Sequence, residues 1–224
     1  MSLYLLIDLF SISVPLLVSF HPRLNLYKRW KYLFPAIFLA MVPYIIWDIY
    51  FTHEGIWGFN EQYLSGLYLF KLPIEEWLFF VCIPYACIFT HYALIQLNKS
   101  IGISDRSVKI ITYLLLSIFS IILLLNIDRL YTAVDMVFGI VILGIVYHYH
   151  KNLLNTYFIT FLLMLLPFFV VNGILTGSGI PEQIVWYNNA ENMGLRLGTI
   201  PVEDTVYAFS LILLNLFLFE KLKR

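Results

Sequence analysis

Seven long apolar stretches constrain the fold of this 224-residue chain more than any other feature. A helix needs about 20 mostly apolar residues to cross the hydrocarbon core of a membrane. Only 12% of the residues are charged, against about 25% in a typical soluble domain. The sequence therefore predicts an all-α, polytopic membrane protein with seven transmembrane helices. The predicted spans cover residues 3–20, 32–51, 74–97, 108–127, 130–149, 153–172 and 203–220.

The charged residues indicate how these spans are oriented. Eleven of the 14 basic residues follow the first, third or fifth span or lie in the C-terminal tail, which leaves Lys71, Arg129 and Arg196 on the other side. Cytoplasmic loops carry the excess of lysine and arginine. We therefore expect an integral protein of the cell membrane with its N-terminus outside and its C-terminus in the cytoplasm. Twelve of the 14 acidic residues then fall in outer loops or outer ends of spans, and only Asp105 and Glu220 are cytoplasmic.

Two short stretches of the chain resemble each other. Residues 72–76 read Leu-Pro-Ile-Glu-Glu, and residues 200–204 read Ile-Pro-Val-Glu-Asp. In each, a glycine lies seven residues before the proline, and an aromatic–asparagine pair ends thirteen residues before it. A register kept over several anchors indicates an internal duplication. We expect a first three-helix repeat over residues 1–97, a linker helix over 98–129 and a second three-helix repeat over 130–224.

The single linker span has a consequence for the two motifs. With one span between them, both repeats have the same orientation, as in membrane proteins built from parallel repeats. Both acidic motifs are therefore predicted to face the outer side. The acids and amides near that side form one layer, which contains Asp48, Asn60, Asn172 and Asn188 besides the two motifs.

Composition excludes several classes of function. A net charge of zero argues against a nucleic-acid partner. The chain has no glycine-rich nucleotide-binding motif, so no bound flavin or nicotinamide is predicted. Cys82 and Cys87 have a spacing that suits neither a disulfide framework nor a zinc site. The five histidines form no ligand pattern with the acids, and we expect neither a metal nor a cofactor.

The paired acids Glu75, Glu76, Glu203 and Asp204 allow two interpretations. Proline followed by acids is typical of a helix start, because acids favour the positive end of the helix dipole. However, a carboxylate at membrane depth is costly and is by default a functional hypothesis. Two copies in register favour the second interpretation, a site for general acid–base chemistry.

Aromatic residues flank the acidic layer and also allow two interpretations. Tryptophan and tyrosine gather at headgroup level in many membrane proteins. Alternatively, their ring faces can stabilise a cation. Both interpretations can hold for different members of the set, which includes Trp47, Trp57, Trp77, Trp186 and Tyr187.

Taken together, these motifs resemble a known family. Residues 46–48 (Ile-Trp-Asp), 55–60 (Gly-Ile-Trp-Gly-Phe-Asn) and 72–80 (Leu-Pro-Ile-Glu-Glu-Trp-Leu-Phe-Phe) are similar to the lycopene cyclase domain. This is the flavin-independent, integral-membrane family that includes heterodimeric bacterial cyclases and the cyclase part of fungal bifunctional enzymes. The second copy, residues 172–204, resembles the partner subunit, so the chain looks like a fused form. Asp204 stands where the first copy has Glu76, which suggests unequal roles for the two copies.

The resemblance implies a lycopene beta-cyclase, an intramolecular lyase or isomerase that converts lycopene to β-carotene via γ-carotene with no net redox change. A protein acid would protonate the terminal double bond, and a base would remove a proton after ring closure. Glu75, Glu76, Glu203 and Asp204 would supply these groups, with Glu75 and Glu203 as the first choice. Asp48, Asn60, Asn172 and Asn188 would orient the acids, and the tryptophans would shield the cation.

The implied partners are lycopene or a related linear carotenoid and membrane lipid, and contacts with other carotenoid enzymes are compatible with the resemblance. The competing interpretation is a small transporter, because some transporters also have two parallel three-span repeats joined by a linker. A light-sensing receptor is less well supported, since the span 203–220 has no lysine for a Schiff base. The ring isomer, the number of ends cyclised, the length of the substrate and the identity of the proton donor stay open.

Overall fold

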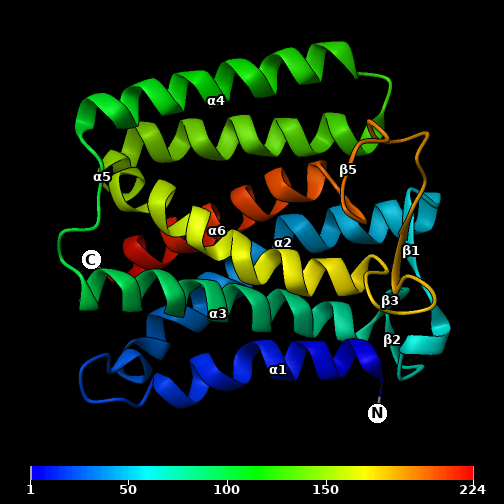
Figure 1. The fold of residues 1–224 in the computed structure, drawn as a ribbon, viewed down its shortest axis with the longest axis horizontal. Helices are drawn as coiled ribbons and strands as arrows, with labels where there is room; N and C mark the ends of the chain where they lie inside the picture. Colours follow the sequence, from blue (N-terminus) through cyan, green and yellow to red (C-terminus); the bar gives the residue numbers. More distant parts are fainter. Residues whose placement is uncertain (1, 224) are drawn as a thin grey trace.

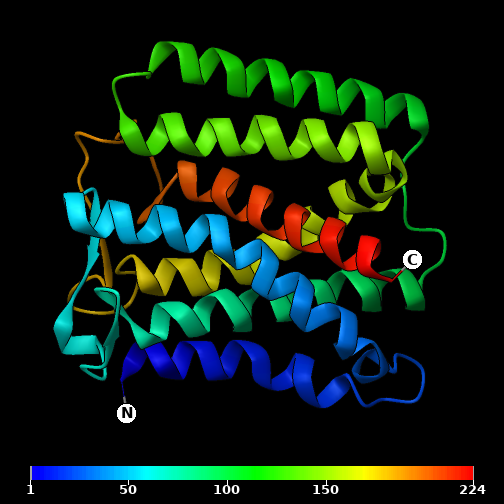
Figure 2. The same ribbon diagram turned by 180° about the vertical axis from the view of Figure 1, so that it is seen from behind.

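The computed structural model describes residues 2–223 and is mostly helical. Six α-helices pack side by side, with α4 at one edge of the bundle and α1 at the opposite edge (Figures 1 and 2). Their bounds are Leu3–Val18 (α1), Trp30–Glu54 (α2), Ile74–Leu97 (α3), Asp105–Leu125 (α4), Leu130–Leu175 (α5) and Glu203–Leu222 (α6). Short 3-10 helices, Leu26–Arg29 and Glu61–Tyr63, precede α2 and follow the first strand.

The helices have the length and apolar surface of a membrane protein. Within residues 2–223, five of them are long and apolar enough to cross a membrane, namely α2 to α6. α1 is apolar but has only 16 residues, so it is shorter than the predicted span 3–20. Large apolar side chains point outward along the bundle, for example Phe10 at 81% exposure and Leu125 at 75%. Such surface is stable against lipid rather than water, which agrees with the prediction of a membrane protein.

α5 contains 46 residues, but its backbone is broken near the middle. His150 has φ −149° and ψ 46°, which is not helical, and α5 turns back on itself there (Figure 1). A straight helix of 46 residues would be about 69 Å long, more than twice the ~30 Å of a hydrocarbon core. We call residues 130–149 the first arm of α5 and residues 151–175 its second arm. The break lies between the predicted fifth and sixth spans.

One end of the bundle carries short strands that connect distant parts of the chain. β1 (Trp57–Phe59) pairs antiparallel with β4 (Val185–Tyr187), and Gly58 lies opposite Trp186 at the centre. The flanking bonds are reciprocal: the Asn60 amide donates to the Ile184 carbonyl at 2.8 Å, and the Asn188 amide donates to the Ile56 carbonyl at 2.8 Å. The pairing is therefore symmetric about its central pair of residues.

Two β-hairpins lie directly before α3 and α6. β2 (Tyr68–Leu69) pairs with β3 (Leu72–Pro73), and β5 (Arg196–Leu197) pairs with β6 (Ile200–Pro201) in the same register. Gly66 and Gly194 precede the two hairpins with φ of 82° and 70°, a conformation that favours glycine. The all-α prediction missed these strands, because each has only two or three residues and no alternating pattern.

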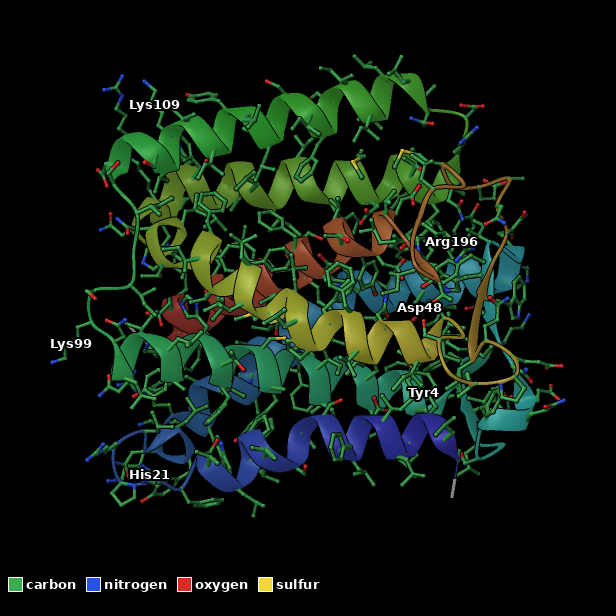
Figure 3. The ribbon with its side chains drawn as sticks, viewed as in Figure 1. Tyr4, His21, Asp48, Lys99, Lys109 and Arg196 are labelled. Carbon is green, nitrogen blue, oxygen red and sulfur yellow. The ribbon has the colours of Figure 1, made fainter. Side chains whose placement is uncertain are left out.

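The two ends of the bundle differ in composition. Tyr4, Asp48 and Arg196 lie toward the end with the strands, whereas His21, Lys99 and Lys109 lie toward the other end (Figure 3). The N-terminus is at the strand end and the C-terminus is at the opposite end (Figures 1 and 2). The acidic residues singled out in the sequence are therefore brought to one end of the bundle by the first turns of α3 and α6.

Candidate active site

α3 and α6 start in the same way, and each start buries two acids. Pro73 is the N-cap of α3, and Glu75 and Glu76 lie in its first turn. Glu203 and Asp204 lie in the first turn of α6. Free backbone N–H groups and the helix dipole stabilise negative charge at this position. All four acids are at most 8% exposed, so hydrogen bonds from the protein must replace those from water.

The first acid of each pair binds the loop that precedes its helix. Glu75 Oε1 accepts hydrogen bonds from Ser2 Oγ at 2.7 Å and from the Ser65 backbone amide at 2.7 Å. Glu203 Oε1 accepts from Thr132 Oγ1 at 2.7 Å and from the Met193 backbone amide at 2.7 Å. Each glutamate therefore ties its preceding loop to the start of a distant helix.

The second acid of the first pair meets another acid. Tyr4 Oη donates to Glu76 Oε2 at 2.5 Å, and Trp57 Nε1 donates to Asp48 Oδ1 at 2.8 Å. The Asp48 and Glu76 carboxyl groups are buried neighbours that interact electrostatically and line the same cavity. Two carboxyl groups buried this close to each other are not readily ionised together, because their like charges repel. The arrangement therefore favours one proton on the pair, at the end of the bundle where the strands lie.

Asp204, the second acid of the other pair, is surrounded by neutral donors. Tyr131 Oη donates to Asp204 Oδ1. Asn172 Nδ2 and Tyr187 Oη donate to Asp204 Oδ2 at 2.6 Å and 2.9 Å. Burial, together with the nearby Asp204 carboxylate, raises the pKa of the Tyr187 phenol above its ordinary value, so Tyr187 remains a donor. Three donors to one carboxyl group stabilise its ionised form.

The two halves of the site thus differ at one equivalent position. Asp48 lies in α2 beside Glu76, and Asn172 lies in the second arm of α5 beside Asp204. A carboxyl group in the first half is matched by an amide in the second. The NH2 group of an amide donates hydrogen bonds and has no titratable proton. A carboxyl group can donate a hydrogen bond only when it carries its titratable proton. The two halves therefore offer different hydrogen-bonding groups to their second acid.

An apolar cavity of about 700 Å³ extends from these acids into the bundle. Its polar end is lined by Asp48, Glu76, Asn172 and Asp204, and it reaches as far as Thr90 along α3. From Glu76 to Thr90 the helix rises about 21 Å. Glu75 and Glu203 are absent from the cavity wall. The second acid of each pair therefore lines the cavity, whereas the first acid is hydrogen-bonded to the preceding loop.

The cavity opens toward the surface that faces lipid. Phe10 and Val14 of α1 and Val170 of α5 line it, and all three are more than half exposed. An elongated apolar molecule can therefore enter from the membrane, between α1 and the second arm of α5. Around the acids the wall is aromatic, with rings from Tyr4, Trp57, Phe59, Phe79, Tyr131, Tyr187 and Tyr207.

The remaining residues proposed from the sequence lie outside this cavity. Trp47 is buried behind it, and Trp77 Nε1 donates to the Leu69 carbonyl at 3.2 Å. Trp186 is at the surface, opposite Gly58. Asn60 Nδ2 donates to Glu182 Oε2 at 2.9 Å. Asn188 Oδ1 accepts from the Ala190 amide at 3.1 Å. These two asparagines contact the loops rather than the four acids.

Sequence reasoning missed the hydroxyl donors to the acids. Ser2, Tyr4, Tyr131 and Thr132 were not proposed, although each binds one of the four acids. A signal for the tyrosines was present: Tyr4 precedes Asp8 by four residues, and Tyr131 precedes Asp135 by four. One helical turn separates the members of each pair. The repeated spacing could have identified the tyrosines as equivalent residues of two half-sites.

Comparison with known proteins gave one match. A family model described as Lycopene cyclase matches residues 1–94 and residues 128–222 of the chain. A search of curated proteins and a search of solved structures found no match. The two matched segments include all four acids and every hydrogen-bond donor to them described above.

Proposed function

The chain belongs to the lycopene cyclase family, and we propose that it closes β-ionone rings at the ψ-ends of lycopene without net oxidation or reduction. One observation carries the proposal. The neighbouring carboxyl groups of Asp48 and Glu76 line the same apolar cavity as Asp204, which accepts a hydrogen bond from Asn172, and this cavity opens toward lipid. Ring closure by this route needs a proton donor, a proton acceptor and an apolar space for a cation between them.

The substrate side of the proposal rests on the cavity wall. A linear carotenoid is a long hydrocarbon that partitions into the membrane, and the opening between α1 and α5 faces that environment. Beyond the acid layer, the wall is formed mainly by apolar side chains from α1, α3, α5 and α6. An end of the polyene that slides in along α3 places its terminal double bond at the acids, with the rest of the chain toward lipid.

The first chemical step is protonation. The Asp48–Glu76 pair gives its proton to one carbon of the terminal double bond. The π electrons of that double bond form the new C–H bond, and the neighbouring carbon becomes a tertiary cation. Both carboxyl groups of the pair are then ionised, and the hydrogen bonds from Tyr4 to Glu76 and from Trp57 to Asp48 stabilise the two carboxylates. General acid catalysis of this kind contributes typically about 10²–10⁴-fold to a rate.

Ring closure and loss of a proton complete the reaction. The next double bond along the chain attacks the cation, which forms the six-membered ring and moves the positive charge to a ring carbon. The aromatic faces of Trp57, Phe79 and Tyr207 border this space and stabilise the cation. The Asp204 carboxylate then removes a proton from the ring, so that a double bond forms and the charge is neutralised. One proton enters and one leaves, and the product is an isomer of the substrate.

Glu75 and Glu203 have a different role in this mechanism. They were the first choice for the essential acids on sequence grounds, but both bind loop amides and hydroxyl groups away from the cavity. We assign them as positioning residues that fix the loops carrying the aromatic strands. Glu76, Asp48 and Asp204 are the catalytic residues of the proposal.

The proposal includes a membrane arrangement. The chain has seven spans, counting the two arms of α5 separately, with repeats over residues 1–97 and 130–224 and α4 as the linker. Support comes from the break at His150, from the two hairpins with equal register and from the two segments matched by the family model. The strand end, with the N-terminus, lies outside, and the C-terminus is cytoplasmic.

The test is expression in cells that accumulate lycopene, followed by extraction and chromatography of the pigments. We expect β-carotene and γ-carotene in cells with the wild-type protein. The matched control is Glu76→Gln, which keeps the size of the side chain and removes its acid function. Unchanged lycopene in both cultures, with the wild-type protein present in the membrane, would contradict the proposal. The comparisons give no support to the transporter alternative.

A further inference from the structure

Residues that make equivalent contacts in the two halves of the chain are separated by similar intervals. Tyr4 and Tyr131 bind the second acid of each pair and are 127 positions apart. Asp48 and Asn172, which also contact those acids, are 124 positions apart. Glu76 and Asp204 are 128 positions apart. These intervals allow each residue of α1, α2 and α3 to be paired with its counterpart in α5 and α6.

The cavity occupies only one of the two places that this correspondence allows. Among its lining residues are Ser11 of α1 and Phe168 and Val171 in the second arm of α5. The intervals of 127 and 124 assign to them the counterparts Phe138, Tyr44 and Trp47. We call the cavity the open lobe, and we call the space around Tyr44, Trp47 and Phe138 the plugged lobe.

The plugged lobe is filled by aromatic rings. The Trp47 and Phe138 ring centroids are 4.9 Å apart, and those of Tyr44 and Phe138 are 5.1 Å apart. Tyr207, which lies between the two lobes, contacts Tyr44 and Trp47 with centroid distances of 5.2 Å and 5.1 Å. Tyr44 Oη also donates to Ser210 Oγ at 2.8 Å, which fixes the ring in place.

Two exchanges of size contribute to the difference between the lobes. Ser11 in the open lobe corresponds to Phe138 in the plugged lobe, and Val171 corresponds to Trp47. In each case a small side chain that lines space is matched by an aromatic ring that fills it. Protein interiors pack without large voids, so the two rings leave no room for a ligand there.

We propose that only the open lobe accepts a polyene, so that each binding event cyclises one end of the substrate and releases a monocyclic product. This inference rests on the proposed function. The two halves share one acid layer, and one lobe leads to it from the lipid surface. The second end of the same molecule can reach the acids only after the first has left the cavity and the molecule has re-entered in the reverse direction.

The lobe assignment is tested by copying the plug into the open lobe. Ser11→Phe should lower both polyene binding and the rate of cyclisation in lipid vesicles at least tenfold. Ser13→Phe is the matched control, because Ser13 lies on the same helix, outside the cavity wall and outside the described apolar clusters. It should keep the wild-type rate. Val171→Trp is a second blocking variant in case Ser11→Phe does not fold.

These variants separate the two levels of the proposal. If the wild-type protein forms no ring at all, the proposed function fails. If the wild-type protein forms rings and a folded blocking variant, Ser11→Phe or Val171→Trp, does so at an equal rate, the lobe assignment fails and the function stands.

Release between the two ring closures is tested with the unmodified wild-type protein. Vesicles receive lycopene in large excess over the protein, and an excess of isotopically labelled lycopene is added early in the reaction. We expect unlabelled monocyclic product to accumulate and its conversion to the bicyclic product to be slowed in proportion to the added competitor. The inference would be overturned if unlabelled bicyclic product kept forming at its earlier rate and no released monocyclic product accumulated.

Discussion

At the scale of single residues, Glu76 and Asp204 occupy the same place in two helices but have different neighbours. Glu76 lies beside the Asp48 carboxyl group, whereas Asp204 accepts hydrogen bonds from Tyr131, Asn172 and Tyr187. In the proposed mechanism, carboxyl groups in the same register therefore serve opposite functions, because the neighbours decide whether a carboxyl group keeps its proton.

This difference leads to a prediction about substitutions. Glu76→Gln and Asp204→Asn should each lower the rate of cyclisation by about 10²–10⁴-fold, because one removes the proton donor and the other the acceptor. Glu75→Gln and Glu203→Gln should lower the rate less than tenfold and mainly reduce thermal stability, since a buried hydrogen bond contributes about 1 kcal/mol. Product formation and thermal unfolding in detergent measure the two effects. Loss of activity in Glu75→Gln with unchanged stability would contradict these roles.

Part of this site could be predicted from residues alone. The two acid doublets, Asp48 and Asn172 stand out in the sequence because they recur in register. Which member of each doublet faces the cavity could not be predicted. Consecutive residues on a helix point about 100° apart, so the choice depends on how α3 and α6 are rotated in the bundle. That rotation is set by long-range packing rather than by the local sequence.

At the scale of secondary-structure elements, the pairing of β1 with β4 joins the two halves above the acids. Gly58 lies at its centre, and a Cβ atom there would be 2.4 Å from Trp186 Cζ2. The indole ring lies against the glycine, and no other residue type allows this approach without a shift.

Substitution of Gly58 should therefore destabilise the strand pair. Gly58→Ala should cost about 1–3 kcal/mol of the free energy of unfolding, as other overpacking substitutions do. In a Trp186→Ala background the same change should cost much less, because the clash is removed. Gly144→Ala is the control, since no atom lies within 4 Å of a Cβ atom added there. Thermal unfolding of the four variants provides the measurement, and an equal cost of Gly58→Ala in both backgrounds would argue against the contact.

The elements were predicted to different degrees. Long apolar runs indicated most helices to within a few residues, because hydrophobic length is a strong signal. α4 runs from Asp105 to Leu125 rather than over 108–127, since Ser104 caps it through a hydrogen bond to the Ser107 amide at 3.1 Å. β1 and β4 were not predicted, because their central residues, Gly58 and Trp186, pair across 128 positions of sequence. The hairpin strands were not predicted, because each has only two residues and no alternating pattern.

At the scale of the whole molecule, the bundle separates a basic end from an acidic end. In the proposed membrane arrangement, the strand end faces outward. A cysteine placed at Lys71, in the β2–β3 hairpin, should react with a thiol reagent that does not cross membranes in intact cells. A cysteine at Lys99, between α3 and α4, should react only after the membrane is permeabilised. The native Cys82 and Cys87 would be replaced by alanine in both variants. The reverse labelling pattern would show that the protein has the opposite orientation in the membrane.

The cavity itself could not be predicted from the sequence. Ser11 and Val171, which line it, are small where their counterparts Phe138 and Trp47 are large. In the sequence these residues are ordinary members of apolar runs. Only the packing of α1 against α3, and of the second arm of α5 against both, shows which of them surround a space.

The central claim is that a carboxyl pair of the protein donates a proton to a carbon of the polyene, which then stays in the ring. The most direct test is a single turnover in deuterated water, with the protein equilibrated there and in excess over lycopene. Mass spectrometry should find one deuterium for each ring formed, at the carbon that was protonated, and Glu76→Gln should give almost no product. Rings formed by the wild-type protein without deuterium would contradict the account.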